Sequence, residues 1–174
     1  LAVGDWVLTD PAAGLVVSLL ERHTELKRPI AGLATKYQLI AANVDTLMIV
    51  SSCNADFNPA RLERYLALAA TSQTTPLFVL TKVDLAPDAQ EYLEKAQRLS
   101  PLASAVAIDA QDKTSLDQLQ PWVMPGQTVA LVGSILAGLW RVVINPVGLM
   151  KTSRQTDGSL DLLFRRVEVD GFGV

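Results

Sequence analysis

The residues with the clearest potential for chemistry are Thr81, Lys82 and Asp84, which follow an apolar run at residues 77–80. Such a run predicts a buried strand, and open α/β sheets bind ligands where their strands end. The Asp84 carboxylate can accept two hydrogen bonds from guanine N1–H and its 2-amino group, while the Lys82 stem lies against the base. The pattern therefore predicts a guanine-binding element. The alternative is a surface turn with an incidental Lys–Asp pair.

Two further segments carry residues for the same site. Ala110 follows the next predicted strand, and a backbone N–H beside a small residue can reach the guanine carbonyl oxygen. A later strand at residues 126–133 ends in Gly133 and Ser134, where a glycine turn opening onto a helix would expose backbone N–H groups to phosphate. Because the ends of parallel strands meet at one edge, we expect these residues to converge with Thr81 on one nucleotide.

The elements that must position these residues alternate between strand and helix. Strands are predicted at residues 44–51, 77–80, 103–108 and 126–133, and helices at residues 59–69, 88–99 and 114–119. Asn58 and Pro59 form a typical helix start, with Asn58 as the N-cap. This alternation predicts a parallel sheet with helices packed on both faces.

The first 40 residues have a different pattern. Apolar alternation at residues 4–10 and 15–20 predicts a strand-turn-strand unit that suits part of an OB-fold barrel. Residues 21–37 are rich in charge and contain proline and glycine, so we interpret them as a linker. A solvated linker is the simpler interpretation of its basic side chains, but phosphate contact makes four of them RNA-binding candidates: Arg22, Lys27, Arg28 and Lys36.

Composition limits the classes of function. With 174 residues, 49% of them hydrophobic, the chain can bury a core, and its net charge of −3 argues against nucleic-acid binding through an overall positive field. We find no apolar run of roughly 18 residues and no signal peptide, so we expect no membrane association and a cytoplasmic location. The single cysteine, Cys53, excludes an internal disulfide and a cysteine-based zinc site, and we predict no metal site.

The order of the motifs resembles the RsgA (YjeQ) family of ribosome-small-subunit-dependent GTPases. In most GTPases the phosphate loop comes first, whereas here Thr81–Asp84 precedes the strand at residues 126–134. Residues 4–7, 38–45, 47–58 and 61–66 also carry the resemblance, which covers about residues 1–134. It implies GTP or GDP as ligand, Mg²⁺ as cofactor, the 30S ribosomal subunit and 16S rRNA as partners, and a role in late 30S maturation.

The resemblance also implies a division of the chain and roles for individual residues. The division is a partial OB-fold at residues 1–32, a linker at 33–40, a permuted P-loop GTPase-like domain at 41–134 and an atypical tail at 135–174. The roles are guanine recognition by Thr81, Lys82 and Asp84, base contact by Ala110, and the start of the phosphate loop at Gly133 and Ser134.

The chain departs from the family after Ser134. A working phosphate loop ends in lysine followed by serine or threonine, which contact phosphate and Mg²⁺, but Leu139 and Trp140 stand there instead. No Asp-x-x-Gly follows, and the family's switch segment and C-terminal zinc module are missing. Hydrolysis is therefore doubtful. The alternative is a non-catalytic RNA- or ribosome-binding module, or a truncated pseudo-GTPase. An ATP- or dinucleotide-using enzyme would need a Gly-x-Gly-x-x-Gly after the first strand, which the sequence lacks.

Two explanations account for the tail. When residues 139–146 are translated back into codons and shifted by one base, they are compatible with Ser-Gly-Val, two intervening codons and then Ser-Thr-Leu. This is the family's phosphate loop with the right gap, although the two intervening codons do not fit cleanly. This indicates an out-of-frame or rearranged tail, and the hypothesis fails if the neighbouring frame of the gene lacks the loop. The alternative is a diverged C-terminus with a helix at residues 135–143 and a hairpin that turns at Asp157 and Gly158.

Overall fold

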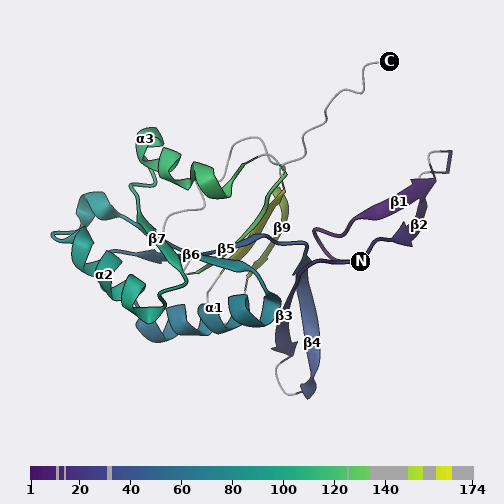
Figure 1. The fold of residues 1–174 in the computed structure, drawn as a ribbon, viewed down its shortest axis with the longest axis horizontal. Coiled ribbons are helices and arrows are strands. Elements are labelled where there is room, and N and C mark those ends of the chain that lie inside the picture. Colours follow the sequence, from purple (N-terminus) through teal and green to yellow (C-terminus); the bar gives the residue numbers. More distant parts are fainter. Residues whose placement is uncertain are drawn as a thin grey trace.

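A six-stranded sheet forms the centre of the fold (Figure 1). The computed structural model describes residues 1–10, 12–13, 15–30, 33–124, 126–133, 149–154 and 160–165. The strand order is β7-β6-β5-β8-β10-β9. The strands are β5 (Thr46–Ser52), β6 (Thr75–Thr81), β7 (Ser104–Ala107), β8 (Thr128–Gly133), β9 (Leu149–Arg154) and β10 (Leu160–Arg165). The first four are mutually parallel, as predicted, whereas β10 runs antiparallel to β8 and β9.

The side chains of the central strands alternate between two apolar cores. In β5, Leu47 and Ile49 face one core, and Met48 and Val50 face the other. The same alternation runs through β6 and β8. Because both faces of these strands are buried, they occur in the sequence as continuous apolar runs.

Helices cover both cores. Helices α1 (Pro59–Ser72) and α2 (Ala89–Leu99) pack on the first core, and α3 (Lys113–Leu116) with the 3₁₀ helix η2 (Asp117–Trp122) packs on the second. Helix α1 begins as predicted, because the Asn58 side chain accepts a hydrogen bond from the Arg61 N–H at 3.1 Å. The predicted arrangement of helices on both faces is therefore present.

Two antiparallel hairpins precede the sheet. The first, β1 (Val7–Asp10) with β2 (Leu15–Leu19), was predicted. The second, β3 (Glu25–Ile30) with β4 (Leu33–Ala42), replaces the linker that was expected over residues 21–37 and assigned to residues 33–40.

Packing explains why the many charged residues at 21–37 led to the expectation of a linker instead of the second hairpin. Leu26 and Ala41 lie opposite each other in β3 and β4, and both are buried in the first core beside α1. An antiparallel pair with one solvated face tolerates charges on that face, as Lys27 shows.

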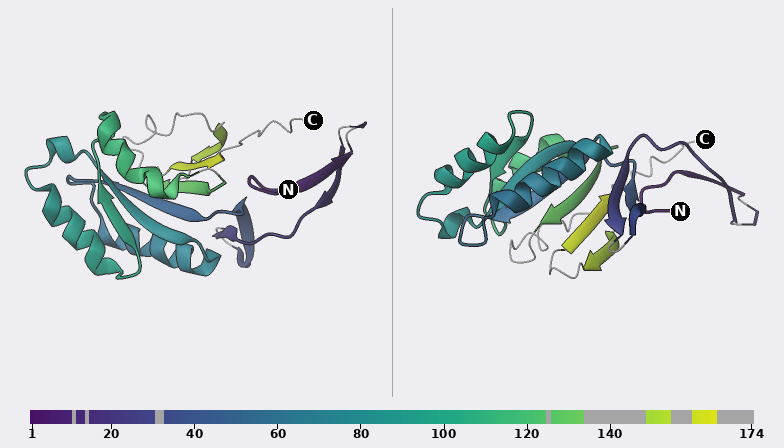
Figure 2. Two further views of the ribbon diagram at one scale, coloured as in Figure 1. Left: turned by 45° about the horizontal axis from the view of Figure 1, so that its top comes forward. Right: turned by 90° about the horizontal axis from the view of Figure 1, so that it is seen from below.

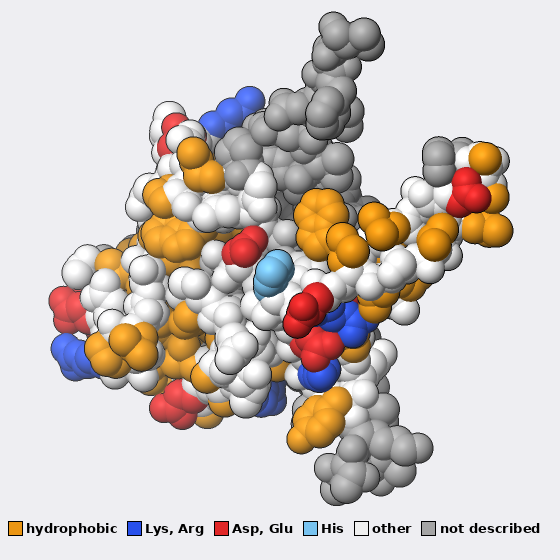
Figure 3. Space-filling view, turned by 45° about the vertical axis from the view of Figure 1, so that its right-hand side comes forward, with side chains coloured by type: hydrophobic (Ala, Val, Ile, Leu, Met, Phe, Trp, Pro, Cys, Tyr) orange, Lys and Arg blue, Asp and Glu red, His pale blue; other side chains and the backbone are white. Residues whose placement is uncertain are grey.

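The β1–β2 hairpin projects away from the sheet, as the two views in Figure 2 show. Hydrophobic side chains gather along it (Figure 3), and Leu15 and Val17 are 67% and 69% exposed. None of the helices in the described part of the chain is long and apolar enough to cross a membrane.

The tail contributes one edge of the sheet. Strand β10 pairs with β8 and with β9, which agrees with the hairpin expected in this part of the chain. The helix expected at residues 135–143 and the turn at Asp157 and Gly158 lie outside the described residues. The out-of-frame hypothesis remains a prediction about the gene.

Candidate functional site

Four parallel strands end at one edge of the sheet, and the predicted nucleotide-binding residues lie at these ends. Thr81 at the end of β6 is level with Ser52 at the end of β5, and Gly133 at the end of β8 is level with Val50. Ala110 follows β7, whose end pairs with the end of β6. The structure therefore brings the three predicted segments to the same edge, with β5 between β6 and β8.

Thr81 anchors the end of β6 to β5. Its side chain is fully buried, and its Oγ1 donates a hydrogen bond to the Ser51 carbonyl oxygen at 3.2 Å. The Thr81 carbonyl oxygen accepts a hydrogen bond from the Cys53 N–H at 2.9 Å. We infer that Thr81 fixes the position of the residues that follow, because its own side chain is directed into the protein.

Lys82 and Asp84 lie on a tight turn beyond this anchor. Lys82 has a left-handed backbone conformation (φ 62°, ψ 36°), and the 3₁₀ turn η1 (Val83–Leu85) follows directly. A non-glycine residue in this conformation costs about 1–2 kcal/mol, and such conformations concentrate at functional sites. The Asp84 side chain is exposed, and neither it nor the Lys82 amine has a hydrogen bond or ion pair with any described residue. Both groups are therefore available to a ligand.

Gly133 ends β8 where the chain passes very close to β5. A Cβ atom added to Gly133 would lie 2.2 Å from the Val50 carbonyl oxygen, a distance that real Cβ contacts do not reach. Only glycine fits there without movement of the backbone. Ser134, the other residue predicted for the phosphate loop, lies outside the described residues.

The described residues contain no ready-made site for the Mg²⁺ ion that the resemblance implies. Across the described residues, no group of three or more His, Cys, Asp or Glu side chains could hold a metal ion. The sequence places Leu139 and Trp140 where a lysine and a hydroxyl residue would contact phosphate and Mg²⁺. In contrast, the chemistry at the end of β6 fits the base of a guanine nucleotide, because the exposed Asp84 carboxylate is an acceptor with no partner among the described residues.

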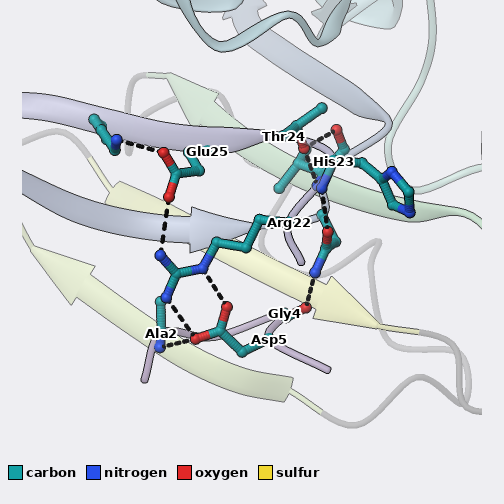
Figure 4. A network of polar contacts seen from close by, with 10 residues as sticks. Ala2, Gly4, Asp5, Arg22, His23, Thr24 and Glu25 are labelled. Atoms are coloured by element: carbon teal, nitrogen blue, oxygen red, sulfur yellow. Dashed lines mark hydrogen bonds and ion pairs between the residues drawn. The ribbon is translucent and has the colours of Figure 1, made fainter. Parts of the chain in front are cut away.

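Two of the four candidate RNA-binding cations are held by carboxylates within the chain (Figure 4). Arg22 donates to both Asp5 carboxylate oxygens, at 2.6 and 2.9 Å, and to Glu25 Oε1 at 2.9 Å. Lys27 forms an ion pair with the same Glu25. Arg28 donates to Gln38 Oε1 at 2.9 Å.

This pairing weakens the case for phosphate contact by Arg22 and Lys27, because carboxylates of the same chain balance their charges. The side chain of Lys36 lies outside the described residues. RNA contact by these four residues remains a prediction.

The polar network around Arg22 also joins the N-terminal segment to the sheet, and no sequence pattern indicated it. The Asn43 side chain donates to the Gly4 carbonyl oxygen at 2.8 Å and accepts from the His23 N–H at 2.9 Å. Asn43 lies between β4 and β5 and is buried. Its contacts and the Asp5–Arg22 pair fix the start of the chain against the β3–β4 hairpin.

The Asp5–Arg22 pair predicts a pH dependence of stability. The hydrogen bond from Arg22 is the main reason that the pKa of the Asp5 carboxyl falls from 3.8 to about 2. A lowered pKa in the folded state stabilises the fold fully above about pH 4, and this stabilisation is lost as the pH falls toward 2. Between about pH 4 and pH 2, the free energy of unfolding measured with urea should fall by up to about 2 kcal/mol more for the wild type than for Asp5→Asn. Parallel pH profiles for the two proteins would contradict the assignment.

A groove between the N-terminal hairpins and α1 is a second feature that sequence reasoning missed. Its lining includes His23, Arg28, Tyr37, Arg64 and Tyr65. Tyr37 is 62% exposed there, and the Arg64 guanidinium lies 5.6 Å from the centre of the Tyr65 ring. The groove is formed by residues far apart in the sequence, so no local pattern predicts it.

Comparison with known proteins gives consistent matches. The family model described as RsgA GTPase matches residues 19–138. The small ribosomal subunit biogenesis GTPase RsgA of Mesorhizobium japonicum is 46% identical over 159 residues, which are 91% of this chain and 46% of that protein. The small ribosomal subunit biogenesis GTPase RsgA 2 of Vibrio vulnificus is 44% identical over 158 residues, which are 91% of this chain and 44% of that protein.

The fold has a solved counterpart. The crystal structure of YjeQ from Thermotoga maritima superimposes with a TM-score of 0.64 at 20% sequence identity, covering 92% of this chain and 59% of that one. At this identity the match establishes the fold alone. The chain spans about half the length of the curated relatives that it matches.

Proposed function

Because this chain belongs to the RsgA GTPase family, we propose that it binds guanine nucleotides at the sheet edge where β6, β7 and β8 end. The observation that carries the proposal is the Asp84 carboxylate, which is exposed and has no partner among the described residues. It lies beyond a strand end that Thr81 ties to the neighbouring strand. A fixed, unpaired acceptor at this edge matches the two donors of guanine.

The proposed roles follow from the chemistry of each group. Asp84 accepts hydrogen bonds from guanine N1–H and the 2-amino group, and the Lys82 stem packs against the base. The Ala110 N–H donates to the guanine carbonyl oxygen. Gly133 and Ser134 begin the segment that faces the phosphates. Adenine has a donor at the 6-position and none at the 2-position, so this set of groups disfavours it.

We further propose that the chain acts on the small ribosomal subunit. The two curated relatives described above are named small ribosomal subunit biogenesis GTPases. The expected partners are the 30S subunit and 16S rRNA, and the expected stage is late maturation. The projecting β1–β2 hairpin is proposed to belong to an OB-fold within residues 1–32, since its two strands form a separate small sheet.

Hydrolysis is the part of the family's activity that we do not assign to this chain. Phosphoryl transfer depends on positive charge at the phosphates, supplied by the phosphate-loop lysine and Mg²⁺. Leu139 and Trp140 supply neither. The functional form that the residues favour is therefore nucleotide binding with little or no turnover. A purely RNA- or ribosome-binding module without nucleotide is the second candidate.

GTP hydrolysis with and without 30S subunits tests this proposal. We expect the chain to cosediment with 30S subunits and to bind GDP, while phosphate release stays at the background rate in both cases. GTP hydrolysis stimulated by 30S subunits would show that the chain has a working phosphate site. It would contradict the proposal that the chain binds nucleotide with little or no turnover. Cosedimentation without any GDP binding would favour the second candidate.

A further inference from the structure

The turn between β7 and α3 is cross-linked by its own polar groups. The Asp109 N–H donates to Ser115 Oγ at 2.9 Å, and the Gln111 N–H donates to Asp109 Oδ1 at 2.8 Å. The Asp109 carbonyl oxygen accepts from the Asp112 N–H at 3.3 Å. The backbone N–H, the carbonyl and the carboxylate of Asp109 are therefore all engaged within one short turn.

Helix α3 holds the other end of this turn. Asp112 caps the helix by accepting from the Thr114 N–H at 3.0 Å and from Thr114 Oγ1 at 2.6 Å. The hydrogen bond from Thr114 Oγ1 is the main reason that the pKa of the Asp112 carboxyl is lowered, and the bond from the Thr114 N–H adds to it. Leu116 packs on the second apolar core. The Ser115 hydroxyl is thus presented to Asp109 from an anchored element.

Ala110 lies between the two N–H groups that this turn satisfies. The N–H groups of Asp109 and Gln111 both have acceptors, whereas that of Ala110 has none among the described residues. Ala110 is half-buried and packs against the second core. The Ala110 N–H is therefore the donor in this turn that no described group satisfies, and it is the one that a ligand can take up.

We propose that Asp109 and Ser115 are positioning residues that set specificity at the 6-position of the base. This inference rests on the proposed function, in which Ala110 donates to the guanine carbonyl oxygen. The Ser115 hydroxyl takes up the neighbouring N–H and holds the turn, so the Ala110 N–H is already in place when the nucleotide binds. A donor that is fixed in advance costs little to order on binding and opposes the 6-amino group of adenine.

Calorimetric titration with GDP and with 6-thio-GDP tests the proposal. The sulfur analogue keeps N1–H and the 2-amino group but has a weaker acceptor at the 6-position. We expect Ser115→Ala to weaken GDP binding by about five- to tenfold, and 6-thio-GDP binding by less than about twofold. Ser115→Thr keeps the hydroxyl and should restore GDP affinity. Ser18→Ala, which removes an exposed hydroxyl on the distant β1–β2 hairpin, is the matched control.

Each outcome of this experiment decides one question. Equal weakening of both nucleotides by Ser115→Ala, or no weakening of either, overturns the positioning role while leaving GDP binding established. Failure of the wild type to bind either nucleotide overturns the proposed function, and this inference with it. Asp109→Ala provides a second variant, because losing the acceptor for Gln111 should produce the same GDP-selective loss.

Discussion

Replacement of Asp84 by alanine is expected to weaken GDP binding by at least about 100-fold. Hydrogen bonds to a charged group contribute about 1.5–3 kcal/mol each, and the proposed contact contains two of them. The Asp84 carboxylate is exposed and bonded to no described residue, so its removal should not disturb the fold. The effect should therefore appear in the dissociation constant measured by calorimetry, with the thermal unfolding temperature nearly unchanged.

Glu63→Ala is the matched control for this change. Glu63 is also an exposed carboxylate, it lies on α1, and its removal changes the net charge by the same amount. We expect its GDP affinity to stay within about twofold of the wild type. Equal losses from the two variants would show that general charge, and not base recognition, controls binding.

Replacement of Gly133 by alanine is expected to destabilise the protein by about 3 kcal/mol or more. The added Cβ would lie 2.2 Å from the Val50 carbonyl oxygen and 3.0 Å from the Val50 Cβ. These are atoms of a central strand paired in parallel with β8. They can move only by opening the pairing between β5 and β8. Urea unfolding should show a lower midpoint, and the GDP affinity should fall as the end of β8 shifts.

Gly126→Ala is the control for Gly133→Ala, because it separates the cost of steric overlap from the cost of the backbone conformation. Gly126 has a left-handed φ of +84°, but a Cβ there would meet nothing within 4 Å. Its replacement should cost only about 1 kcal/mol, the conformational penalty alone. If the two alanine variants were equally stable, the close approach of Gly133 to β5 would not be the reason for glycine at the end of β8.

The parallel sheet could be predicted because its signals are local. The apolar run before Ser52 and the run at residues 77–80 are continuous, since both faces of β5 and β6 are buried. The start of α1 depends on Asn58 and Pro59, which are adjacent in sequence. The convergence of Thr81, Ala110 and Gly133 at one edge then follows from the parallel direction of the strands.

The N-terminal architecture could not be predicted in the same way. Strand β3 carries Lys27 and Arg28, and only its contacts with α1 and β4 show that Leu26 is a core residue. The ion pair between Asp5 and Arg22 joins residues 17 positions apart and has no local signature. Nor does any sequence pattern indicate the left-handed conformation of Lys82, because a lysine usually avoids it.

The sequence indicated which residue types lie at the strand ends of the candidate site. The structure adds which of these side chains are buried and which are exposed. Thr81 was grouped with the base-contacting residues, but its buried side chain bonds to Ser51 and serves as an anchor. Asp109 and Ser115 received no role from the sequence, since their hydrogen bond depends on how the turn after β7 folds. Their role is therefore visible only in three dimensions.

The most direct test of guanine recognition is the nucleotide preference of Asp84→Asn, measured by calorimetry with GDP and xanthosine diphosphate. Xanthine replaces the 2-amino donor of guanine with a carbonyl acceptor, and an asparagine side chain supplies the matching donor. The wild type should prefer GDP, and Asp84→Asn should prefer xanthosine diphosphate. If the variant kept the preference for GDP, or if the wild type bound ADP as tightly as GDP, Asp84 would not be the residue that reads the base.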